Sequence, residues 1–155
     1  MSEGGRSAPA RGDTVAIAAD HAGVALKSAI AKDLETLGFR VVDLGTNGPE
    51  SVDYPDYARA VSEAVAGSRA KWGVLVCGSG IGMSMAANRN PAIRAAVVHD
   101  ALSARLSRQH NDANVLALGA RLVGEDVAKD CVRVFFSTPF EGGRHERRVA
   151  KLGGK

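Results

Sequence analysis

Five short, predominantly apolar runs, each followed by a segment with helical periodicity, are the feature that most constrains the fold. The runs cover residues 14–19, 39–42, 73–77, 93–98 and 114–118. Runs of this length that lack polar alternation are typical of strands buried on both faces of a parallel sheet. Because strands and helices alternate along the chain, the sequence predicts a three-layer α/β/α sandwich around a five-stranded parallel sheet.

Helix signals and turn residues fill the intervals between the runs. The second expected helix begins near Pro55, and the third runs through Asn88. Later helices are expected over about 100–110, 124–136 and 144–152. We therefore expect one Rossmann-like domain over residues 14–152, with flexible tails at 1–13 and 153–155.

Composition argues against several classes of protein. No apolar run is long enough to span a bilayer, and the N-terminal residues lack the apolar core of a secretion signal. Two cysteines without a C-x-x-C pair or a His/Cys cluster argue against a disulfide framework and a structural zinc site. They favour a reducing, cytoplasmic setting. The net charge of +3 permits a nucleic-acid partner without requiring one.

The strand expected over 73–77 leads into a glycine-rich turn that begins with a cysteine, Cys77-Gly78-Ser79-Gly80-Ile81-Gly82. Glycines at alternate positions allow a tight bend that turns several N–H groups in one direction, which suits a negatively charged ligand. The start of a helix favours the thiolate form of a neighbouring cysteine. Cys77 is therefore a candidate reactive group, whereas Cys131 lies on the apolar stripe of its helix and is expected in the core.

Two other interpretations of the turn fit the residues less well. A dinucleotide fingerprint would place the third glycine one position later and would follow the first strand, although Asp100 lies at a suitable distance for a ribose contact. A P-loop would need a Gly-Lys-Ser/Thr sequence, which does not follow this turn.

Polar residues gather where the expected strands end. Asp20-His21 follows the first strand, Cys77 ends the third, His99-Asp100 follows the fourth and Arg121 follows the fifth. In an open parallel sheet, ligands bind beyond the carboxyl ends of the strands, at the point where the strand order reverses. We therefore expect the functional site at this edge of the sheet.

A second group of candidates lies nearer the C-terminus. Leu102, Leu106 and His110 recur at a spacing of four, so His110 is expected at the edge of a buried helix face. Arg144 and Arg148 share one face of the last helix. Guanidinium groups match phosphate oxygens, so this face is either a phosphate clamp or an ordinary solvated surface.

Together these motifs resemble those of the type B ribose-5-phosphate isomerases and the related galactose-6-phosphate isomerase subunits. The resemblance extends from about Val15 to Leu152. It rests on seven segments in order: Asp20-His21-Ala22-Gly23, Asp53-Tyr54-Pro55, Cys77 to Gly82, Ala86-Ala87-Asn88, Ser107 to Asp112, Gly119-Ala120-Arg121, and Glu141 to His145 with Arg148.

The resemblance implies an aldose–ketose isomerase of the pentose phosphate pathway. Such an enzyme interconverts D-ribose 5-phosphate and D-ribulose 5-phosphate through an enediolate, without a cofactor or a metal. By the same resemblance, the Cys77 thiolate moves a proton between C2 and C1, and Ser79 relays one between O1 and O2. His110, with Asp20 nearby, opens the sugar ring. The implied anion hole consists of the N–H groups of Gly78, Ser79, Gly80, Ile81 and Gly82, and the implied sugar and phosphate ligands are His21, Tyr54, Asn111, Arg121, Arg144 and Arg148.

The resemblance also implies a homodimer with active sites shared across the interface, which in some members pairs into a tetramer; Arg121 could come from either subunit. Some members lack the cysteine and carry a glutamate base at the position of Met83, so this chain resembles the cysteine subtype. Two alternatives stay open. One is an isomerase of allose or galactose 6-phosphate, and the other is a non-catalytic module that binds nucleotides or nucleic acid. The main interpretation expects neither a nucleic-acid nor a membrane partner.

Overall fold

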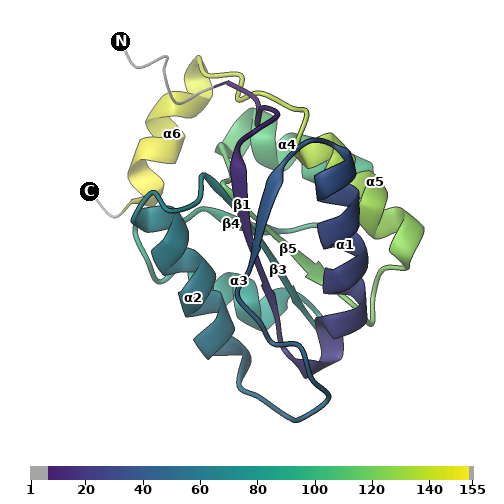
Figure 1. The fold of residues 1–155 in the computed structure, drawn as a ribbon. Helices are drawn as coiled ribbons and strands as arrows, with labels where there is room; N and C mark the ends of the chain where they lie inside the picture. The colour runs from purple at the N-terminus through teal and green to yellow at the C-terminus, as the bar shows by residue number, and fades with distance from the viewer. Residues whose placement is uncertain (1–6, 154–155) are drawn as a thin grey trace.

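The computed structural model describes residues 7–153 and confirms the predicted three-layer α/β/α architecture (Figure 1). All strand pairs are parallel, and the sheet order is β2-β1-β3-β5-β4. The strands are β1 (Thr14–Ala19), β2 (Arg40–Asp43), β3 (Trp72–Cys77), β4 (Ala95–Val97) and β5 (Val115–Gly119). The helices are the 3-10 turn η2 (His21–Gly23), α1 (Val24–Thr36), α2 (Tyr54–Ala66), α3 (Ile81–Ala87), α4 (Ala101–Asn111), α5 (Glu125–Phe135) and α6 (Arg144–Leu152).

The sheet separates two apolar cores. Side chains such as Ile17, Val74 and Leu116 point to one face and pack under α1, α4 and α5. Their neighbours along the strands, such as Ala18 and Leu75, point to the other face and pack under α2 and α3. The central strands β1, β3 and β5 are buried on both faces, as their nearly continuous apolar runs predict. Cys131 is fully buried in the first core, as expected.

The edge strand β4 is shorter than predicted. The sequence suggested 93–98, but only Ala95–Val97 pairs with β5. Ile93 instead closes a turn on the carbonyl of Asn90, and the N–H of Arg94 donates to the side chain of Asn114. A backbone turn at Ile93 and a side-chain acceptor at Arg94 thus replace the ladder at the beginning of this strand.

The buried face of α4 differs from the predicted one. Leu102 is 52% exposed, and the buried residues are Ala104, Ser107 and Arg108. The Arg108 guanidinium is fully buried because it donates to the carboxylate of Asp112 at 3.0 Å and stacks over the ring of Trp72. A face defined by a paired, buried arginine is not visible in an apolar periodicity.

The ends of the domain are partly described. Residues 1–6 and 154–155 lie outside the described residues, so the tails expected over 1–13 and 153–155 stay predictions there. Within the described part, Asp13 accepts a hydrogen bond from the indole of Trp72 at 2.9 Å and so contacts the domain. Over residues 7–153, none of the helices combines the length and apolar character needed to cross a bilayer.

Candidate active site

The strand order reverses between β1 and β3, and the predicted site lies at their carboxyl ends. From β1 the chain crosses to β2 on one side, and β3 pairs with β1 on the other. Asp20 and His21 follow β1, while Cys77 ends β3. A pocket of about 540 Å³ opens here, and its lining includes predicted residues from both strands and from elsewhere in the chain: Asp20, His21, Tyr54, Cys77, Gly78, Ser79, Ile81, Gly82 and Arg121.

The glycine turn wraps around the Cys77 thiol. The N–H of Gly80 donates to Cys77 Sγ at 3.1 Å, and the N–H of Ile81 donates to Ser79 Oγ at 3.2 Å. Two of the five N–H groups of the expected anion hole are therefore used inside the turn. Those of Ser79 and Gly82 have no hydrogen-bond partner among residues 7–153.

Close backbone contacts leave the turn little freedom. Gly80 has a φ of 79°, in the left-handed region that favours glycine. A Cβ atom on Gly119, at the end of β5, would lie 2.6 Å from the carbonyl carbon of Ser79. The turn therefore rests directly on the backbone of β5, which fixes the position of Ser79.

Hydrogen bonds to backbone groups orient both polar residues that follow β1. Asp20 is 8% exposed, and its Oδ1 accepts the N–H of Ala22 at 3.0 Å. The Nδ1 atom of His21 accepts the N–H of Val52 at 3.2 Å. Because Nδ1 is an acceptor, the proton of the neutral ring is on Nε2, and His21 can donate from that atom.

Tyr54 and Arg121 complete the lining of the pocket beside the glycine turn. The Tyr54 ring packs against Gly82, where a Cβ atom would lie 2.5 Å from a ring carbon. The Arg121 side chain lies beside Gly78, with Cδ 3.5 Å from the position of a Cβ on that glycine. Arg121 therefore belongs to the same chain's pocket. Met83 is fully buried in the second core, so an apolar residue suits this position.

The second group of predicted residues lies at the other edge of the sheet. Helix α4 starts beyond the carboxyl end of β4 and runs back toward the amino end of the parallel strand β5. His110, in the last turn of α4, therefore lies near the amino end of β5. Figure 1 shows α6 near the N-terminal end of β1, with α3 toward the opposite end of the sheet. At about 3.3 Å per strand residue, these edges are on the order of 15 Å apart. The structure thus does not bring His110, Arg144 or Arg148 to Cys77 or Asp20 within one chain.

His110 stacks on a residue that had no predicted role. Its ring lies 4.4 Å from that of His145, centroid to centroid, with an angle of 14° between the ring planes. Both Nε2 atoms face Glu141 Oε1, at 3.9 Å for His110 and 3.6 Å for His145. Burial, followed by the charges of Arg144 and the His110 ring, holds the pKa of His145 below its ordinary value. Glu141 and His145 lie four residues apart across a helix start, a spacing that could have suggested this contact.

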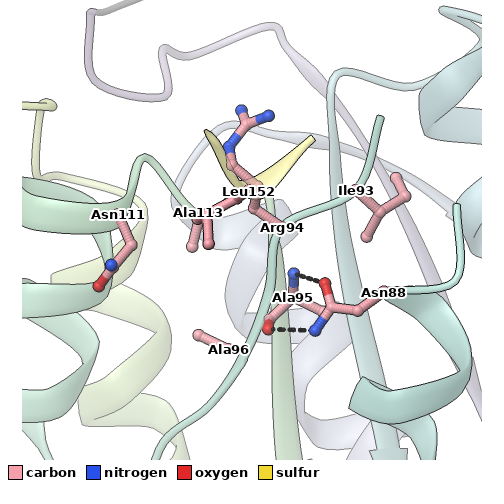
Figure 2. A pocket seen from close by; sticks show the side chains of 8 residues that line it. All are labelled: Asn88, Ile93, Arg94, Ala95, Ala96, Asn111, Ala113 and Leu152. Carbon is pink, nitrogen blue, oxygen red and sulfur yellow. Dashed lines mark hydrogen bonds between the residues drawn. The ribbon is translucent and has the colours of Figure 1, made fainter. Parts of the chain in front are cut away.

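Asn111 lines a separate pocket of about 480 Å³ beside the edge strand β4 (Figure 2). The opposite wall includes Asn88, whose side-chain amide donates to the carbonyl of Ala95 at 2.9 Å and accepts its N–H at 2.8 Å. Arg94 and Leu152 also contribute to the lining. Asn111 therefore faces a different space from Cys77 within one chain.

Sequence reasoning also missed Lys27, a buried residue that organises the loop between β2 and α2. Its side chain is 1% exposed, and Nζ donates to Asp43 and Asn47, at 2.6 Å in each case. Asp43 in turn accepts the N–H of Gly45 at 2.9 Å. This loop leads to Val52 and Tyr54, so Lys27 supports part of the pocket wall from behind. A lysine on an otherwise apolar helix face was the sequence signal that could have indicated a buried, paired side chain.

Comparisons with known proteins identify the family. The model of the ribose/galactose isomerase family matches residues 15–152. The chain belongs to this family. It is 48% identical to ribose-5-phosphate isomerase B of Escherichia coli over 138 residues, which cover 89% of this chain and 93% of that protein. It is 44% identical over 139 residues to a putative sugar phosphate isomerase of Bacillus subtilis, covering 89% and 93% of the two chains.

Solved structures of family members have the same fold. Ribose-5-phosphate isomerase B of Clostridium thermocellum superposes with a TM-score of 0.90 at 50% identity, covering 91% of this chain and 95% of that one. The type B enzyme of Trypanosoma brucei has a TM-score of 0.90 at 44% identity, covering 92% and 98%. The family resemblance inferred from the motifs is therefore confirmed.

Proposed function

We propose that this chain interconverts D-ribose 5-phosphate and D-ribulose 5-phosphate through an enediolate. The observation that carries the proposal is the Cys77 thiol, which accepts the Gly80 N–H in a pocket at the switch point of a ribose/galactose isomerase fold. Relatives named ribose-5-phosphate isomerase B support the choice of substrate. Membership of the pentose phosphate pathway follows from that substrate.

Cys77 acts as the base in this proposal. The thiolate removes the proton at C2 of the open-chain aldose and returns it at C1, so no covalent bond to the enzyme forms. The side chain is 4% exposed, which keeps water from the transferred proton. A positioned base contributes roughly 10²–10⁴-fold to such a proton transfer.

The turn stabilises the charge that develops on O1 and O2. The N–H groups of Ser79 and Gly82 are available as donors, and the Ser79 hydroxyl can relay a proton between the two oxygens. Each well-placed donor to such an oxyanion contributes about 2.7–4 kcal/mol. The Gly80 N–H acts on the sulfur instead, so it assists the base.

His21 and Arg121 are proposed to bind the phosphate. Arg121 supplies a permanent positive charge at the pocket mouth, while His21 donates from Nε2 as a neutral ring. Tyr54, which also lines this pocket, is proposed to contact the sugar. Asp20 assists ring opening.

A homodimer with shared sites would place the second group of residues at a catalytic pocket. His110, Asn111, Arg144 and Arg148 cannot reach Cys77 of their own chain, so in this proposal they act at the pocket of the partner subunit. Large apolar side chains exposed beside the pocket and on α4 would be covered by such a partner, namely Ile81, Met85 and Leu102. The proposal allows two such dimers to pair into a tetramer. We propose no nucleic-acid or membrane partner.

The decisive experiment is a direct isomerase assay on purified protein treated with EDTA. We expect turnover of ribose 5-phosphate without added metal. Because the matching family model covers both ribose and galactose isomerases, the same assay should include allose 6-phosphate and galactose 6-phosphate. A higher kcat/KM for a six-carbon substrate would move the assignment to that alternative. Absence of turnover on all three would refute the proposal.

A cytoplasmic location is part of the same proposal. Cys77 and Cys131 are both free thiols. A thiolate base needs a compartment in which thiols stay reduced.

A further inference from the structure

We propose that His110, Glu141 and His145 form a binding site for a divalent first-row transition metal of the zinc type, separate from the Cys77 pocket of the same chain. The three side chains come from the end of α4, the loop before α6 and the first turn of α6. Imidazole and carboxylate are ordinary ligands of such ions.

The spacing of the ligand atoms supports the site. In a tetrahedral zinc centre with bonds of 2.0–2.2 Å, neighbouring ligand atoms lie about 3.3–3.6 Å apart. Glu141 Oε1 lies 3.6 Å from His145 Nε2 and 3.9 Å from His110 Nε2. One ligand atom from each of the three residues lies within 4.8 Å of the others. The Glu141 oxygen therefore lies close to the required spacing from both nitrogens, and a turn of the His110 ring is needed for all three atoms to bind one ion.

A second, independent observation is the state of His145. Its side chain is 7% exposed, and Nε2 is buried without a hydrogen-bond partner among the described residues. A buried ring nitrogen left in this way costs stability. The atom faces Glu141 and His110, so an ion between the three residues would satisfy it.

The arrangement also indicates which ions suit the site. The nearly parallel rings of His110 and His145 cannot both point at one ion, so His110, whose side chain is 38% exposed, must turn. Arg144 and Arg148 lie nearby and repel cations. Mg²⁺ and Ca²⁺ depend on several oxygen ligands, so one carboxylate would not hold them here. Zn²⁺, Cu²⁺ and Ni²⁺ form directional bonds to neutral imidazole and are favoured.

Occupation of the site has a consequence that rests on the proposed function. If His110 opens the sugar ring at the partner's pocket, an ion that ligates Nε2 removes this group from catalysis. Zinc would then inhibit the isomerase, and EDTA would restore activity.

Binding is tested by isothermal titration of the EDTA-treated full chain with Zn²⁺ and, separately, with Mg²⁺. We expect one Zn²⁺ per chain and no Mg²⁺. Glu141→Gln and His145→Gln should each weaken zinc binding by at least about tenfold. Loss of a residue that only hydrogen-bonds to a metal ligand already lowers metal affinity by about this factor. His99→Gln removes a histidine outside the site and should bind zinc as the wild type does. The exposed Glu141 makes the first variant safe for folding. Wild-type affinity in both site variants would overturn the proposal.

The thiol of Cys77 could also take up zinc, so Co²⁺ is used as a spectroscopic probe. We expect a spectrum of nitrogen and oxygen ligands that is unchanged in Cys77→Ser. A thiolate charge-transfer band that disappears in this variant would overturn the assignment to the histidine site. The two proposals fail separately. An inactive protein that binds zinc as described refutes only the isomerase, whereas an active enzyme that takes up no zinc refutes only the metal site.

Discussion

Gly119→Ala tests whether the contact between the glycine turn and β5 matters for catalysis. The new Cβ atom would lie 2.6 Å from the carbonyl carbon and oxygen of Ser79, about 0.8 Å short of ordinary contact. Both groups are backbone, so the turn must move away from β5 by a comparable distance. A misplacement of about 1 Å near reacting groups can cost on the order of 10²-fold in rate. We expect kcat to fall by about that factor.

The same substitution has a limited cost in stability. Overpacking of a tight site costs about 1–3 kcal/mol, which in a domain of this size lowers Tm by roughly 2–12 °C. The protein should therefore remain folded at 25 °C, where circular dichroism and the isomerase assay are measured together. Gly124→Ala is the matched control, since a Cβ there meets nothing within 4 Å. Wild-type kcat in Gly119→Ala, or an equal loss in the control, would refute the reasoning.

Three further predictions address other parts of the molecule. Cys77→Ser should lower kcat by roughly 10²–10⁴-fold with an unchanged circular dichroism spectrum; near-normal turnover would exclude Cys77 as the base. Val52→Pro removes the N–H that His21 Nδ1 accepts, whereas Val52→Ala keeps it. KM for the sugar phosphate should rise by roughly tenfold at most in the proline variant alone, and equal KM values in both would count against this orientation of His21. Burial raises the pKa of Cys131 to about 11 from 9.0, so its contribution to the free energy of unfolding is complete below pH 9 and is lost as the pH rises through 11. In urea titrations, the free energy of unfolding should therefore fall less between pH 9 and 11 in Cys131→Ala than in the wild type. An equal fall in the two proteins would contradict the assignment.

Much of the fold could be predicted because local pattern and burial agree. The run over 14–19 is nearly all apolar, and β1 has those same bounds. The prediction was less accurate for β4, where the hydrogen bonds of Asn114 and Asn90 replace strand pairing. It was wrong for the buried face of α4, which depends on the Arg108–Asp112 pair. Both failures involve polar side chains whose partners are distant in sequence or buried, and periodicity records only apolar character.

Some features of the candidate site could likewise be predicted from the sequence, and others could not. Asp20, His21 and Cys77 could be placed together, since the carboxyl ends of parallel strands share one edge. The remote position of His110 also follows from the alternation, because every helix in a parallel sheet runs back to the amino edge. The hydrogen bond from Val52 to His21 could not be foreseen, since it is made by a backbone group in a loop without periodicity. The pairing of Glu141 with two histidines likewise depends on how α6 packs against α4.

Asn88 has a consequence for how copies of this chain can associate. Strand β4 lies at the edge of the sheet, and the unpaired backbone groups of an edge strand can pair with a strand from another chain. At Ala95 both backbone groups are already occupied by the Asn88 amide, as Figure 2 shows. This single side chain therefore takes the place of a neighbouring strand at that residue. A second copy that meets this residue cannot pair with its backbone, which disfavours open-ended growth of the sheet at this point.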